Sequence, residues 1–226
     1  EEISQGAGRI AGSLGLSNLI MFYDANNVQL STYVDDITDE DTAKKYEAWG
    51  WSVISINGND AHEIRMALKK ANEETQKPTL IIGKTLMGKG SMDANGNSFE
   101  NKVSTHGQPL TAAGACIRKT IENLGGNPDE PFQIFDDVAQ LYASRKESLK
   151  KIVDQRKLVQ AQWEKENPAL ALKFHSFYAN ELPNIDFASI VQKPDQATRV
   201  ASATILGHFS EKIENMIVSS ADLSNS

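Results

Sequence analysis

The chain has 226 residues, of which 40% are hydrophobic and 23% are charged. These proportions are typical of folded globular proteins and exclude a fibrous repeat or a wholly disordered chain, and the longest apolar run, residues 19–23, is too short to span a bilayer. The net charge of −7 disfavours nonspecific binding to nucleic acid or to anionic membranes.

The first residues predict a helix followed by a strand. A helical stripe of apolar residues predicts an amphipathic helix over residues 1–14, and Gly15 follows where a C-cap belongs. Residues 19–23 form a continuous apolar run, typical of a strand covered on both faces, and turn-forming residues follow at 24–27. The stripe consists of Ile3, Ala7, Ile10, Ala11 and Leu14.

Helices and strands then alternate. A Thr-x-x-Asp start at Thr38, with acids that favour the positive end of a helix dipole, predicts a helix over residues 38–49. A strand is predicted over residues 51–56, a helix capped by Asp60 follows, and residues 79–82 form the next strand. Short links between such elements indicate an α/β fold, a parallel sheet flanked by helices.

Beyond Lys84 the pattern changes. Residues 85–110 form a loop rich in Gly, Asn and Ser that is too long for a simple connector, and such loops are usually functional or disordered. The rest of the chain predicts helices over 111–123, 132–167, 169–180 and 197–213, a connector over 183–194 and a short strand over 216–218.

Two asparagines follow the first predicted strand. Asn26 and Asn27 stand at its carboxyl end, where ligands bind in open parallel sheets. An asparagine oxygen and a nearby backbone carbonyl are hard ligands suited to Mg²⁺ or Ca²⁺, particularly when a diphosphate supplies more oxygens. The pair is also typical of an ordinary turn, and the residues alone leave both interpretations open.

His106 lies near the end of the glycine-rich loop, in Thr-His-Gly-Gln-Pro-Leu. A histidine there can act as an acid or base or can donate to a substrate oxygen, and Lys89 in the same loop can meet an anion. Either residue can equally be a solvated bystander. Residues 145–157 contain six bases and two acids, which indicates a solvated helix face or, as the less favoured alternative, a surface for phosphate or RNA.

Six segments, read in order, resemble the transketolase family over essentially the whole chain. Each motif is weak by itself, whereas all of them in family order are specific. The segments are Glu1–Ser4 with 11–20, Tyr23–Asn26, Tyr46–Trp51, Lys77–Leu80, His106–Leu110, and Ala197–Ser202 with Ser220–Ser226.

The resemblance implies a role for each matching residue. Asn26 through its side chain and Val28 through its carbonyl would bind the metal that holds the cofactor diphosphate. His106 would lie near the cofactor and the sugar hydroxyls as the catalytic histidine. The remaining implied roles are cofactor contact for Met87 and Asp222, binding of the sugar phosphate for Arg199 and Ser226 with His106, and a place at the dimer interface for Glu1.

The reaction implied by the resemblance is reversible transfer of a two-carbon ketol unit from a ketose phosphate, xylulose 5-phosphate, to an aldose phosphate in the pentose phosphate pathway. The implied cofactors are thiamine diphosphate and Mg²⁺ or Ca²⁺, and the implied partners are sugar phosphates and a second identical subunit, with no nucleic acid and no membrane. The single cysteine, Cys116, permits no internal disulfide and agrees with a cytoplasmic location.

The resemblance also divides the chain into the C-terminal part of a diphosphate-binding domain (1–126), a helical connector (127–194) and the start of a pyrimidine-binding domain (195–226). The metal-binding aspartate of the family would precede Glu1, and the glutamate that activates the cofactor would follow Ser226. We therefore expect a central piece of the enzyme that is inactive alone.

Three other interpretations stay open. The neighbouring enzymes are a dihydroxyacetone synthase and a deoxyxylulose-phosphate synthase, and the histidine loop and the Ser-Ala-Asp-Leu segment argue against the second. The third is a non-catalytic assembly module that keeps the fold.

Overall fold

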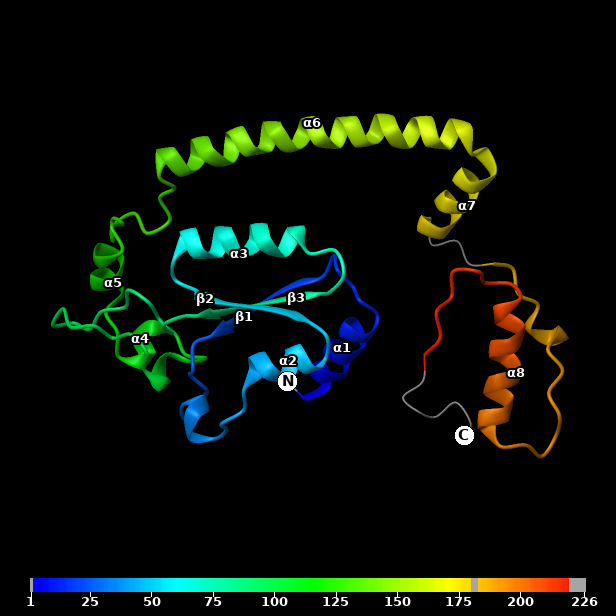
Figure 1. Ribbon diagram of the computed structural model, residues 1–226, viewed down its shortest axis with the longest axis horizontal. Coiled ribbons are helices and arrows are strands. Elements are labelled where there is room, and N and C mark those ends of the chain that lie inside the picture. Colours follow the sequence, from blue (N-terminus) through cyan, green and yellow to red (C-terminus); the bar gives the residue numbers. More distant parts are fainter. Residues whose placement is uncertain (1, 180–182, 220–226) are drawn as a thin grey trace. The chain divides into compact units, whose positions relative to one another are not determined.

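The computed structural model describes residues 2–179 and 183–219, and the chain divides into two compact units, Glu1–Ile134 and Phe135–Ser226 (Figure 1). None of the described helices is both long and apolar enough to cross a membrane. The first unit contains α1 (Glu2–Ser13), β1 (Ile20–Ala25), the 3-10 turn η1 (Val34–Asp36), α2 (Thr42–Ala48), β2 (Ser52–Asn57), α3 (Ala61–Glu73), β3 (Thr79–Lys84), η2 (Val103–Thr105), α4 (Leu110–Ala113) and α5 (Ile117–Asn123).

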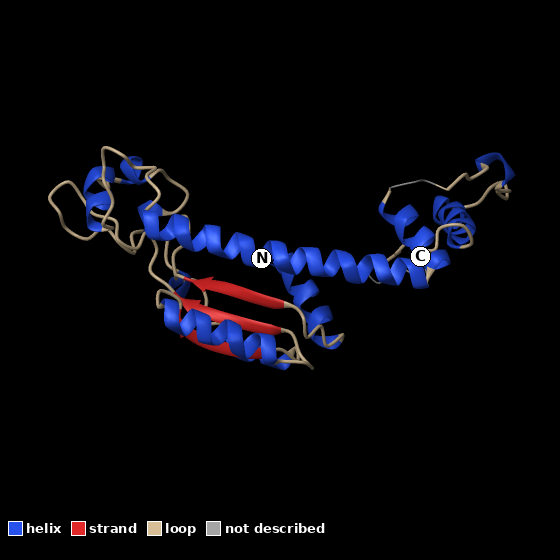
Figure 2. Ribbon diagram, turned by 90° about the horizontal axis from the view of Figure 1, so that it is seen from above, coloured by secondary structure: helices blue, strands red, loops and turns tan. Residues whose placement is uncertain are grey.

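The first unit is built on a three-stranded parallel sheet in the order β1-β3-β2 (Figure 2). The chain passes from one edge of the sheet to the other through α2 and returns to the centre through α3. Right-handed crossovers in opposite directions place their helices on opposite faces of a sheet. Figure 1 shows this arrangement, with α3 on one face and α1 and α2 on the other. The predicted α/β class is confirmed.

The central strand carries the core on both faces. Leu80 and Ile81 are fully buried, and they point to opposite faces because side chains alternate along a strand. Leu80 packs with Ala11 and Trp51 under α1 and α2, whereas Ile81 packs with Ala67 and Ala71 of α3. A strand buried on both faces reads as a continuous apolar run, so the prediction for residues 79–82 is confirmed.

The prediction that residues 19–23 are covered on both faces is wrong. Phe22 is 42% exposed and Tyr23 is 37% exposed, because β1 forms one edge of the described sheet. The strand itself is confirmed, and it extends to Ala25.

The buried face of α1 differs from its predicted apolar stripe. Ile10 and Leu14 are more than 60% exposed, while Ala11 is buried. The helix instead packs near Trp49 and Trp51 through Gly8 and Gly12. The carbonyl of Gly8 accepts a 2.8 Å hydrogen bond from the Trp51 indole. Glycine permits this close approach, which an apolar pattern does not reveal.

Two glycines of α1, Gly6 and Gly12, give a stability prediction. A Cβ at Gly12 would lie 1.9 Å from the carbonyl oxygen of Trp49, whereas a Cβ at Gly6 meets no atom within 4 Å. We expect Gly12→Ala to lower the free energy of unfolding by about 2 kcal/mol or more, since the helix must shift. Gly6→Ala should raise it by about 0.5–1 kcal/mol through helix propensity. Urea denaturation followed by circular dichroism checks both, and equal effects of the two variants would contradict the close approach.

Two helix predictions need correction, and a third is confirmed. The helix expected from Thr38 begins at Thr42, because Asp41 rather than Thr38 caps it by accepting from the Lys44 N–H. Asp60 caps α3 as predicted, accepting from His62 and Glu63. The helix expected over 111–123 is broken into α4 and α5, because Gly114 takes a left-handed conformation (φ 105°).

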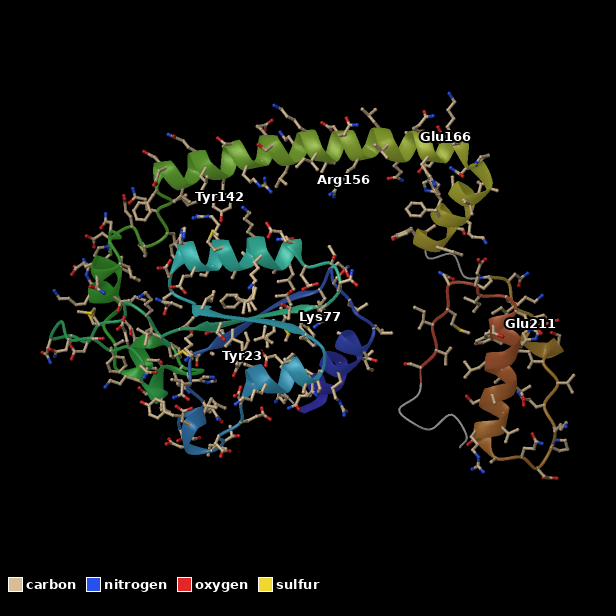
Figure 3. All side chains as sticks on the ribbon, viewed as in Figure 1. Tyr23, Lys77, Tyr142, Arg156, Glu166 and Glu211 are labelled. Carbon is tan, nitrogen blue, oxygen red and sulfur yellow. The ribbon has the colours of Figure 1, made fainter. Side chains whose placement is uncertain are left out.

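The second unit is mainly helical in its described part. A single long helix, α6 (Asp136–Glu166), is followed by α7 (Pro168–Tyr178), the 3-10 turn η3 (Phe187–Ser189) and α8 (Thr198–Ser210), close to the predicted ranges. Side chains project from α6 on all sides, Tyr142 and Arg156 among them (Figure 3). The strand predicted over 216–218 is wrong: the described residues offer it no partner strand, and a strand exists through its hydrogen-bonded neighbour.

Candidate functional site

The carboxyl ends of β1 and β3 lie side by side. In their parallel register Asp24 faces Gly83 and Ala25 faces Lys84, and the hydroxyl of Thr85 donates to the Asp24 carboxylate. Figures 1 and 2 show that the strands end on one side, toward the segment that leads from β3 to α4. Two loops, one after each strand, therefore begin at the same edge of the sheet.

The first loop is a tight turn that starts at Asn26. Its side-chain Oδ1 accepts a 2.9 Å hydrogen bond from the Val28 N–H. Asn27 has a left-handed backbone (φ 63°), and its amide group both donates to and accepts from Asp35. Val28 is buried and forms an antiparallel bridge with Tyr33. The turn thus ties the Asn26 side-chain oxygen to the Val28 backbone, and the role of this pair as metal ligands stays a prediction.

The turn also fixes an acidic residue in its charged form. The Thr32 hydroxyl donates to Asp36 Oδ2 at 2.6 Å, and the Tyr33 N–H donates to the same oxygen at 3.3 Å. These hydrogen bonds lower the pKa of Asp36, the hydroxyl having the larger effect. The charged Asp36 carboxylate therefore joins Thr32 and Tyr33 and stabilises this part of the turn.

The second loop, residues 85–110, is folded rather than extended. The Asn101 N–H donates to the Met87 carbonyl at 2.8 Å, and the Gly90 N–H donates to the Glu100 carboxylate at 2.7 Å. Ser91 is fully buried at the centre of this loop. The loop has its own internal hydrogen bonds, so it can hold a side chain in a defined place.

His106 follows η2 near the end of this loop. Its backbone N–H donates to the Val103 carbonyl at 3.1 Å, and the residue is half-buried. The Nδ1 atom is buried and has no hydrogen-bond partner among the residues that the structure describes. An unpaired buried nitrogen is costly, and a ligand or a catalytic role is one explanation for it. A neighbouring position, Gly107 (φ 71°), lies close enough to Leu30 that an added Cβ would be 3.2 Å from its Cδ2.

The structure brings together only part of the predicted set. Asn26, Val28, Met87 and His106 all belong to the two loops at the sheet edge, and Met87 is half-buried there. Arg199 is exposed in the first turn of α8, in the second unit. The predicted positions Glu1, Asp222 and Ser226 lie outside the described residues.

One contact at this edge was not predicted. The Tyr33 hydroxyl donates to the Asn101 carbonyl at 3.0 Å and so joins the two loops. The two residues are 68 positions apart, and neither belongs to a motif. Only the three-dimensional structure reveals the pair.

These residues fit a divalent metal held by a diphosphate. Within the described part of the chain, no group of three or more His, Cys, Asp or Glu side chains could hold a metal ion. The donors present are an amide oxygen and a backbone carbonyl, both hard oxygens, which need further oxygens to complete a coordination sphere. A diphosphate supplies such oxygens, and the unpaired His106 Nδ1 leaves a polar atom ready for a further partner.

The chain is similar to transketolases by sequence. Residues 1–183 match a family model described as transketolase, thiamine diphosphate binding domain. The whole chain aligns with the transketolase of Streptococcus pyogenes at 32% identity, covering 30% of that protein. It also aligns along its whole length with transketolase 1 of Pasteurella multocida at 34% identity, covering 34% of that protein.

Solved structures show the same similarity. A transketolase from Pichia stipitis in complex with sedoheptulose-7-phosphate matches 99% of this chain and 33% of its own, with a TM-score of 0.82 and 27% identity. A transketolase from Campylobacter jejuni matches 99% of this chain and 33% of its own, with a TM-score of 0.73 and 33% identity. The chain thus spans about a third of the length of the relatives it matches.

Proposed function

Because the chain belongs to the transketolase family, we propose that it forms the diphosphate-binding side of an active site that transfers a two-carbon ketol unit between sugar phosphates. The observation that carries this proposal is the meeting of two loops at one sheet edge, one with Asn26 and Val28 and the other with His106. The proposed donor is xylulose 5-phosphate and the proposed acceptor is an aldose phosphate, in the pentose phosphate pathway. The sugar phosphate in the Pichia stipitis complex supports this substrate class.

Asn26 Oδ1 and the Val28 carbonyl would hold Mg²⁺ or Ca²⁺ together with the diphosphate of thiamine diphosphate. The bound cofactor supplies the carbon nucleophile that breaks and forms the carbon–carbon bond. Met87 would pack its apolar side chain against the cofactor from the second loop, and Asp222 would make a further contact with it. These residues bind and orient the cofactor, and they perform no step of the transfer themselves.

His106 would hold or move a proton at the sugar hydroxyls. Its Nδ1 atom is buried and has no hydrogen-bond partner among the described residues, so the hydrogen-bonding capacity of this nitrogen is unused in the ligand-free chain. Arg199 and Ser226 would bind the substrate phosphate, for which a guanidinium fork is well suited. In the assembly that we propose, two identical subunits in the cytoplasm share the site, Glu1 lies at their interface, and the chain divides at 126 and 194 as the sequence predicts.

The test is ketol transfer from xylulose 5-phosphate to ribose 5-phosphate by the gene product that contains this chain, with and without thiamine diphosphate and Mg²⁺. Transfer that requires both supports the proposal, and transfer without the cofactor contradicts it. Transfer from xylulose 5-phosphate to formaldehyde in preference to ribose 5-phosphate would instead favour a dihydroxyacetone synthase, and no transfer to either acceptor would favour an assembly role.

A histidine variant separates chemistry from cofactor binding. We expect His106→Ala to lower kcat about 100-fold, because it removes a group that moves protons, while the Kd for thiamine diphosphate changes far less. Steady-state kinetics and calorimetric titration measure the two quantities. His62→Ala, on the exposed start of α3, is the matched control and should leave both unchanged. A loss of the same size in both histidine variants would argue against a role for His106.

A further inference from the structure

Tyr33 links the metal-binding turn to the loop that carries His106. Its hydroxyl donates to the Asn101 carbonyl at 3.0 Å. Asn101 is held in turn, because its N–H donates to the Met87 carbonyl at 2.8 Å and its backbone takes a left-handed conformation (φ 53°). The tyrosine hydroxyl therefore bonds to a fixed point of the second loop, between Met87 and His106.

The tyrosine itself projects from a rigid base. Its backbone bridges to Val28, and its N–H donates to the Asp36 carboxylate. The next residue, Val34, donates its N–H to the Asn27 carbonyl at 2.9 Å. These bonds fix the backbone of Tyr33 to the turn that begins at Asn26, so the side chain starts from a defined point.

The second loop also comes close to the turn at a second point. Gly107 lies beside Leu30, so that an added Cβ would be 3.2 Å from the Leu30 Cδ2. Leu30 belongs to the same turn as Tyr33, and Gly107 directly follows His106. The second loop thus approaches the turn on both sides of η2: Asn101 accepts a hydrogen bond from Tyr33, and Gly107 leaves little room for a side chain beside Leu30.

We propose that Tyr33 is a positioning residue whose hydroxyl holds residues 87–106 against the Asn26–Val28 turn and so sets the position of His106. This inference rests on the proposed function, because that function gives His106 its role. Tyr33 touches neither reacting atoms nor metal in this arrangement, and it acts only through the loop.

The first test needs no cofactor. Hydrogen exchange is measured on ligand-free wild-type protein and on Tyr33→Phe, which loses only the hydroxyl. We expect the amides of Asn101, Thr105 and His106 to exchange about fivefold faster in the variant, because one hydrogen bond that restrains their loop is gone. Peptides from α3 are the internal control and should not change. Tyr142→Phe, whose side chain is 71% exposed on α6, is the matched control variant.

The second test asks whether Tyr33 acts through His106. We expect Tyr33→Phe to lower kcat about fivefold while the apparent affinity for Mg²⁺ stays within about twofold, a split that a general loss of structure would not produce. In a double-mutant cycle with His106→Ala, the tyrosine change should cause no further loss of kcat.

Unchanged exchange in residues 99–106 of Tyr33→Phe would overturn the proposal, and so would kinetic losses that simply add. Failure of the proposed function gives a different result, namely that the wild-type gene product shows no cofactor-dependent transfer. The exchange experiment on ligand-free protein still decides in that case whether Tyr33 holds the loop.

Discussion

Replacing Asn26 by alanine is expected to weaken the binding of thiamine diphosphate with Mg²⁺ by about 100-fold, because one change removes two contributions. The Oδ1 atom is the proposed metal ligand, and it also accepts the 2.9 Å hydrogen bond from the Val28 N–H that shapes the turn. Without it, the Val28 carbonyl loses its fixed direction. Calorimetric titration of the gene product with thiamine diphosphate at fixed Mg²⁺ measures the change.

Two further variants make this result specific. Asn26→Asp keeps an oxygen at the same place and can still accept from Val28, so we expect it to retain most of the affinity. Asn72→Ala removes an amide of the same kind from the exposed side of α3, where it donates to the Leu68 carbonyl, and should leave the affinity unchanged. Equal affinities of Asn26→Ala and wild type would exclude Asn26 as a ligand.

The strand that leads into this turn was predictable from sequence because its signal is local. Asn26 and Val28 are two residues apart, and they follow a strand whose apolar run is plain in the sequence. The strand end and the hydrogen bond from the Val28 N–H to Asn26 follow short-range rules: alternation of strands with helices, and the tendency of asparagine to bond to the backbone nearby. The metal-binding role of Asn26 and Val28 stays a prediction that the family resemblance supplied. The strands and α3 were predictable for the same reason, since Asp60 caps its own helix.

The contacts between the two loops were not predictable in this way. Tyr33 and Asn101 meet only because β1 and β3 are neighbours in the sheet, and the backbone carbonyl of Asn101 has no sequence signature. The glycine face of α1 is a similar case. Gly8 and Gly12 face the packed side of the helix because they carry no side chain, whereas the apolar pattern pointed to Ile10 and Leu14. In both cases the contact depends on segments that lie far apart in the sequence and meet only in the folded chain.

The basic segment 145–157 of α6 is a feature that the sequence shows plainly but whose role the structure does not decide. The segment 145–157 lies within α6, where Leu149 and Val153 are each more than 40% exposed and the charged residues surround them. The interpretation as a solvated helix face remains a prediction, as does the alternative of a phosphate or RNA surface. The charge pattern is the same in both cases, so only a binding measurement across salt concentrations separates them.

Trp51 is expected to give the largest stability effect in the first unit. Its side chain is 3% exposed and packs with Ala11, Leu80 and Ile82, and its indole donates to the Gly8 carbonyl at 2.8 Å. Trp51→Ala leaves a cavity between α1 and the sheet and removes the indole donor from the Gly8 carbonyl. We expect it to lower the free energy of unfolding of this unit by about 3–5 kcal/mol.

Hydrogen exchange of peptides from β3 measures this effect within the first unit, because the amides of that strand open only when its core opens. Trp51→Phe keeps most of the packing but loses the indole donor, so its effect should be intermediate. Trp163→Ala is the matched control, since this tryptophan packs edge-on against Phe174 in the second unit and is 37% exposed. It should leave β3 protected. If Trp51→Ala and Trp163→Ala changed exchange in β3 equally, the sheet would not depend on the contact with α1. The close packing of Gly8 and Gly12 would then have no part in holding the strands of the site in place.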